Sequence, residues 1–111
     1  MVKNKVLPIP LASIDSATFT GAYQLLTTLA QPCVTLQIVN NSDRDITVSY
    51  DGTIDHDFIQ DTKERGWAFQ NNAQPANFVA ILAKNTKVYV KGSAGGTGLV
   101  TLSGWYSPQG L

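Results

Sequence analysis

The chain has 111 residues, a formal net charge of zero and only 14% charged residues. This length corresponds to one domain, and the scarcity of Lys and Arg is atypical of proteins that bind nucleic acid through its phosphates. No apolar run is long enough to span a bilayer, and Pro8 and Pro10 interrupt the short run near the N-terminus, so we expect neither a membrane span nor an export signal.

Residues 1–12 are predicted to form an extended N-terminal arm, because the two prolines hold the backbone near polyproline II. The arm carries Val6, Leu7 and Ile9, and an isolated extended segment cannot bury all of these apolar side chains. Two arrangements are open: an edge strand on the chain's own domain, or an arm that lies on a neighbouring subunit. Residues 13–111 are predicted to form a single domain.

Residues 14–20 and 23–29 follow the arm, and each is predicted to contain a short strand. The second segment also fits one or two helical turns, but its threonines and the nearby Pro32 favour extended structure.

Apolar and polar residues alternate most clearly in residues 34–39 and 46–50. Successive side chains of a strand point to opposite faces, so both segments are predicted to be strands with one buried and one exposed face. Residues 40–45 are rich in Asn and Asp and are predicted to form the turn of a β-hairpin that joins them. Cys33 precedes the first strand and is predicted to be a small buried hydrophobic residue rather than a reactive thiol.

Five more segments of the chain are predicted to be strands: 54–59, 67–69, 78–82, 87–91 and 99–106. The glycine-rich residues 92–98 are predicted to be a hairpin loop between the last two strands. In the final strand Val100 and Leu102 fall on one face and Trp105 on the other. Short strands separated by turn residues predict an all-β fold, a small antiparallel β-sandwich or jelly roll of about eight strands.

Motifs that would carry chemistry are weak in this chain. A strand over Asp55, His56 and Asp57 would offer two carboxylates on one face and the chain's one histidine on the other, too few ligands for zinc. The glycine-rich loop lacks the Lys-Ser/Thr pair and the helix that complete a phosphate-binding loop, and no nucleophile elbow is present. We therefore predict a protein that is not an enzyme, with no catalytic residue, metal or cofactor.

Four aromatic residues have three possible roles: packing in the core, contact with another subunit, or a platform that binds sugars. They are Trp67, Phe69, Trp105 and Tyr106. Together with the apolar arm they supply the residues that we predict at a protein interface: Val6, Leu7, Ile9, Trp67, Trp105 and Tyr106.

The segments TLQIVNNSDRDITVSYDG (residues 35–52) and KVYVKGSAGGTGLVTLSGWY (residues 87–106) carry a family resemblance. From about residue 23 to residue 106 the chain resembles the capsid decoration proteins of short-tailed phages, also called cement or staple proteins, of the epsilon15-like type. The resemblance implies a jelly roll without catalytic residues.

It also implies a place in the virion. Such a protein, made in the host cytoplasm, binds the outer capsid surface after shell assembly and bridges neighbouring capsomers without covalent bonds. The implied partners are the major capsid protein and the protein itself, as a homodimer or alternatively a trimer, with no nucleic acid and no membrane. The alternative hypothesis is a β-sandwich module of a phage tail, fibre or collar that binds host glycan through exposed aromatic residues.

Overall fold

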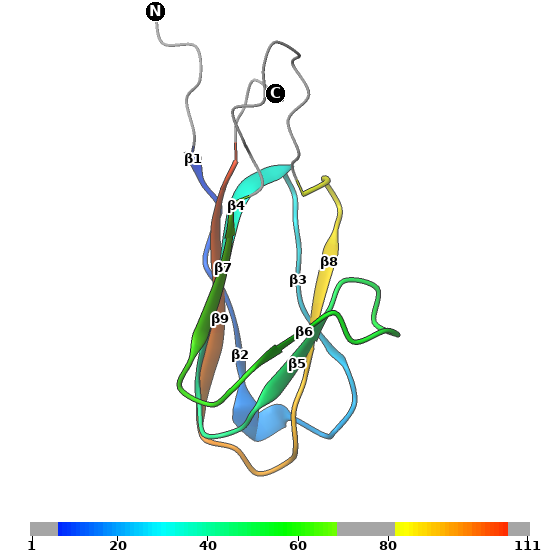
Figure 1. Ribbon diagram of the computed structural model, residues 1–111, viewed down its shortest axis with the longest axis vertical. Helices are drawn as coiled ribbons and strands as arrows, with labels where there is room; N and C mark the ends of the chain where they lie inside the picture. The colour runs from blue at the N-terminus through cyan, green and yellow to red at the C-terminus, as the bar shows by residue number, and fades with distance from the viewer. Residues whose placement is uncertain (1–6, 69–81, 107–111) are drawn as a thin grey trace, which may run out of the picture.

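The computed structural model describes residues 7–68 and 82–106, with Trp67 and Ala68 described by their backbone alone. The described residues form two antiparallel sheets that pack face to face (Figure 1). The strands are β1 (Leu7–Pro8), β2 (Ala12–Asp15), β3 (Gln24–Thr28), β4 (Cys33–Ser42), β5 (Ile46–Ser49), β6 (Asp57–Ile59), β7 (Glu64–Ala68), β8 (Lys87–Lys91) and β9 (Gly98–Tyr106), with a short 3-10 turn at Ser16–Thr18. The prediction of an all-β fold is confirmed.

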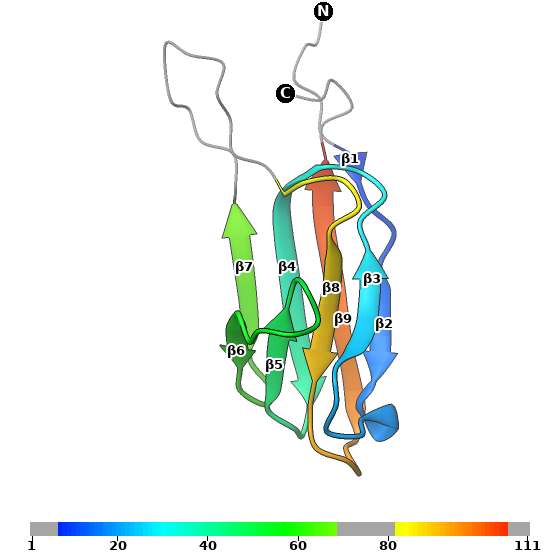
Figure 2. The ribbon, with the colours of Figure 1, turned by 90° about the vertical axis from the view of Figure 1, so that its right-hand side faces the viewer.

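The order of the strands is that of a jelly roll. One sheet has the order β1-β9-β4-β7 with β2 also paired to β9, and the other has the order β3-β8-β5-β6 (Figure 2). Strands β1 and β2 pair with successive parts of β9, so they act as one interrupted edge strand. The chain passes from one sheet to the other at most of its connections, as in an eight-stranded jelly roll. The predicted jelly roll is therefore confirmed.

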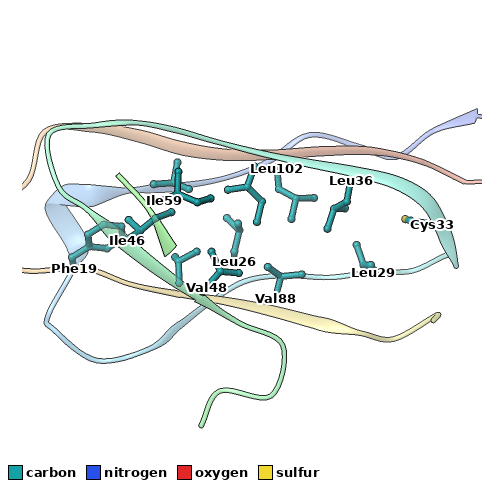
Figure 3. Packing of buried hydrophobic residues seen from close by; sticks show 13 residues of the cluster. Phe19, Leu26, Leu29, Cys33, Leu36, Ile46, Val48, Ile59, Val88 and Leu102 are labelled. Carbon is teal, nitrogen blue, oxygen red and sulfur yellow. The ribbon is translucent and has the colours of Figure 1, made fainter. Parts of the chain in front are cut away.

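The core lies between the two sheets (Figure 3). The predicted alternation is confirmed on β4, where Leu36 and Ile38 are 2% and 0% exposed, and on β9, where Val100 and Leu102 are both buried. Cys33 is buried as predicted, and this burial raises the pKa of its thiol.

The predicted hairpin between residues 34–39 and 46–50 is wrong, because β4 and β5 lie in opposite sheets. The reason is Asn40, which is fully buried at the end of β4. Its side-chain amide donates hydrogen bonds to the carbonyls of Arg44 at 2.7 Å, Ile59 at 3.2 Å and Gln60 at 3.1 Å. These bonds hold residues 43–45 as an arch that crosses from one sheet to the other.

The hairpin predicted at residues 92–98 is also wrong, because the two strands that it would join lie in opposite sheets. Residues 92–97 connect β8 to β9, which lie in opposite sheets. This second arch is tied to the first one, because the guanidinium of Arg44 donates to the carbonyls of Ala94 and Gly95. The backbone N–H of Thr97 also donates to the carboxylate of Asp43 at 2.9 Å.

Three strand predictions need other corrections. Residues 24–28 are a strand, so the helical alternative is wrong there, and a bulge in β3 buries Leu26 while leaving Leu25 exposed. The strand predicted over residues 54–59 is shorter, since β6 begins at Asp57. The alternation predicted over residues 46–50 places Ser49 on the exposed face, but Ser49 is buried, and its hydroxyl accepts hydrogen bonds from the N–H groups of the turn that follows. The strand predicted over residues 78–82 lies outside the described residues except for Leu82.

Candidate functional site

Four of the six predicted interface residues gather at one end of the sandwich. Leu7 lies opposite Tyr106 on β9, and the N–H of Ile9 donates to the carbonyl of Gly104 at 3.0 Å. Leu7 and Pro8 therefore form an edge strand on the chain's own domain, which is one of the two arrangements expected for the arm. The fourth residue, Trp105, is next to Tyr106 in sequence and points to the other face of the sheet.

The remaining two predicted interface residues are only partly placed. Val6 lies outside the described residues. Trp67 is described by its backbone, which pairs with Leu36 on β4. The residues brought together at this end belong to two different surfaces.

The first surface is an apolar groove along one edge of the sandwich, which we call the edge groove. Residues 8–11 form one wall, residues 27–31 form the other, and Tyr106 also lines the groove, which encloses about 350 Å³. Leu11 is the most exposed large apolar residue in the described chain at 68%. Sequence reasoning did not select Leu11, although it continues the apolar run of the arm.

The second surface lies on the outer face of the sheet that contains β4 and β9. Trp105 is 47% exposed there. Beside it is a shallow hollow of about 350 Å³, lined in part by Thr35, Gln37, Gly66 and Ser103. We call Trp105 and these four residues the Trp105 platform.

The acidic residues around His56 do not converge on a common site. The carboxylate of Asp55 accepts a hydrogen bond from the hydroxyl of Tyr23, and the ammonium of Lys91 lies 3.3 Å from it. The Nδ1 atom of His56 accepts from the backbone N–H of Tyr50 at 3.0 Å.

Asp57 pairs instead with the guanidinium of Arg65 at 3.1 Å, an ion pair that joins the two sheets. Among residues 7–68 and 82–106, no three potential metal ligands form a group. The same part of the chain contains no helix with the length and hydropathy needed to cross a membrane.

The segment 50–56 between β5 and β6 folds over the outer face of β8 (Figure 2). The Asp51 carboxylate organises it, accepting hydrogen bonds from the N–H groups of Ile54 and Thr53 at 2.9 and 2.8 Å and from the hydroxyl of Ser49 at 2.9 Å. These bonds lower the pKa of Asp51 from 3.8 to about 2.

This pKa shift predicts a pH-dependent contribution to stability. Because the folded pKa lies below the unfolded one, the Asp51 carboxylate stabilises the fold above pH 3.8, and the contribution is lost as the pH falls towards about 2. We therefore expect the stability difference between the wild-type protein and Asp51→Asn to be constant at neutral pH and to shrink across this window. Denaturation with urea at several pH values measures it. A difference that stays constant down to pH 2 would contradict the prediction.

Comparison with protein-family models, with curated proteins and with solved structures found no significant match to this chain.

Proposed function

We propose that this protein is a non-enzymatic bacteriophage virion protein that decorates the outer surface of the capsid. In this role it clamps neighbouring capsomers without covalent bonds and so stabilises the shell. The family resemblance of residues 35–52 and 87–106 supports the role, and so does the stiff two-sheet body. The observation that carries the proposal is the edge groove.

The edge groove has the character of a protein contact. Its exposed apolar side chain, Leu11, stands beside a concave apolar surface, and well-packed apolar anchors dominate binding at protein interfaces. The wall over residues 8–11 contains two prolines, so little backbone entropy is lost when a partner binds. We propose that the major capsid protein occupies this groove.

A clamp needs two contacts with the shell, and self-association supplies the second one. In a homodimer with two-fold symmetry each copy presents the same surface, so one dimer offers two edge grooves to two capsomers. A trimer would offer three. When both edge grooves belong to one oligomer, binding of the first raises the effective concentration of the second at the shell to about millimolar. The oligomer therefore binds tightly even if each single contact is weak. Binding to the assembled shell alone then stabilises that shell by mass action.

Replacing Leu11 with asparagine tests the groove. Because the substitution places an amide in an apolar contact, we expect the variant to bind capsids at least about tenfold more weakly, which corresponds to about 1.4 kcal/mol. Capsids that lack the protein are mixed with purified protein at several concentrations and sedimented, and the bound fraction is measured. The unfolding midpoint should stay close to the wild-type value, since Leu11 is largely exposed.

Leu99→Asn is the matched control. Leu99 is 45% exposed on β9, where it pairs with Asp15 at the opposite end of the sheet from the groove. We expect this variant to bind capsids as the wild type does. Equal binding by both variants, or equal loss in both, would show that the edge groove is not the contact surface.

A further inference from the structure

The Trp105 platform combines an exposed aromatic ring with neutral polar groups. Gln37 on β4 lies between Gly66 on β7 and Ser103 on β9, and all three belong to one row across the sheet. Thr35 and Trp105 form the neighbouring row. Trp105 therefore lies next to a row of small and polar residues and lines the same hollow with them.

Gly66 lines the hollow and places no side chain in it. A Cβ atom built there would make ordinary contacts with the Leu36 carbonyl oxygen at 3.7 Å and the Cγ of Gln37 at 3.9 Å, so a side chain fits at this position without a clash. The backbone of Gly66 is not in the left-handed region, and it pairs regularly with β4. Neither the backbone conformation nor the packing of the described residues requires glycine at position 66. The effect of glycine here is that no side chain fills this part of the hollow.

Two polar side chains of the platform are positioned to bond a ligand. The side-chain amide of Gln37 donates to the carboxylate of Glu64 at 3.2 Å, which fixes its orientation and leaves its carbonyl oxygen and second N–H for other partners. The side chain of Ser103, opposite Gln37 on β9, also lines the hollow, and its hydroxyl both donates and accepts hydrogen bonds.

From this geometry we infer that the Trp105 platform is a binding site for a neutral oligosaccharide. The apolar face of a sugar ring stacks on the indole, whose flat surface is large and partly exposed. The sugar hydroxyls bond the side chains of Gln37 and Ser103, which between them offer donors and acceptors without charge. None of the described residues that line the hollow is cationic, and the nearby Glu64 carboxylate repels acidic sugars. The ligand class is therefore a neutral glycan rather than a sialylated or sulfated one.

The inference is independent of the proposed capsid contact, because the platform and the edge groove are separate surfaces. A protein bound at the edge groove leaves the outer face of this sheet to other partners. On a capsid, the platform would add glycan binding to a protein whose other surface holds the shell.

The test begins with an array of neutral, sialylated and sulfated oligosaccharides probed with the wild-type protein. The best neutral oligosaccharide is then titrated by calorimetry against three variants. Trp105→Ala removes the stacking surface, and Gly66→Val fills the hollow with a residue that suits a strand. Both are expected to weaken binding at least tenfold. Phe58→Ala is the matched control, because Phe58 is 50% exposed but lies on β6 in the other sheet, and it should bind as the wild type does.

Gly66→Val keeps the test decisive even if Trp105→Ala unfolds. The inference is overturned if no neutral oligosaccharide binds the folded wild-type protein, or if Gly66→Val and Phe58→Ala bind the sugar equally well. It is also overturned if Trp105→Ala and Gly66→Val lose capsid binding while the wild type binds no sugar, since the platform is then a protein contact. Failure of Leu11→Asn to affect capsid binding would leave this result unchanged.

Discussion

Replacing Asn40 with alanine is expected to lower the free energy of unfolding by about 3–5 kcal/mol, as for other losses of a buried hydrogen-bond network. Asn40 is fully buried, and its amide donates to three backbone carbonyls, those of Arg44, Ile59 and Gln60. Its carbonyl oxygen accepts from the hydroxyl of Ser42 at 2.6 Å. Alanine removes the bonds that hold the arch between the sheets, and the carbonyls of Arg44 and Gln60 keep only their hydrogen bonds from the Ser42 hydroxyl and the Lys63 N–H. Unfolding in urea, followed by circular dichroism, measures the loss.

Asn41→Ala is the control for this prediction. Asn41 is the next residue on the same strand but is exposed, so its replacement should change the free energy of unfolding by less than about 0.5 kcal/mol. If Asn40→Ala is within 1 kcal/mol of the wild-type value, the arch does not depend on this side chain.

Replacing Gly98 with alanine is the second large effect, a loss of about 3–5 kcal/mol that combines backbone strain with overpacking. Gly98 begins β9 with a φ of +100°, a conformation that residues with a Cβ rarely adopt. An added Cβ would lie 2.3 Å from the Asn41 carbonyl oxygen and 2.9 Å from the Cα of Ser42. Since both atoms belong to the backbone of β4, the two central strands of the sheet would have to separate.

Gly21→Ala separates the two causes. Gly21 has a similar φ of +87°, but a Cβ there would meet nothing within 4 Å. This variant should therefore lose only about 1 kcal/mol, the cost of the left-handed backbone. Thermal and chemical denaturation of both variants give the comparison. Equal losses at the two positions would mean that the contact between β9 and β4 is looser than the structure indicates.

The alternation of residues predicted most strands and their buried faces, because that information is local. Leu36 and Ile38, or Val100 and Leu102, are separated by one residue and point into the core whatever the strand order is. The assignment of a strand to one sheet or the other does not depend on local sequence. A polar turn is compatible both with a hairpin within one sheet and with an arch between two sheets. One signal was present in the sequence: Asn40 continues the inward-facing positions of β4, and a polar residue there needs buried partners.

The candidate site was predictable in part. The arm and the last strand were selected from their apolar and aromatic residues, and the structure brings Leu7 and Tyr106 together. The second wall of the edge groove comes from residues 27–31, and its position depends on sheet order and not on any local pattern. The Trp105 platform depends in the same way on Gly66, which is brought beside Gln37 by the pairing of β7 with β4.

Electron cryomicroscopy of phage particles with and without this protein tests the central claim most directly. The proposed role predicts additional density outside the shell, over the junctions between capsomers, in copy numbers comparable with those of the shell protein. The jelly roll should fit this density with residues 8–11 and 27–31 against the shell. Density confined to a tail or collar, or a fitted orientation in which this edge faces solvent, would contradict it.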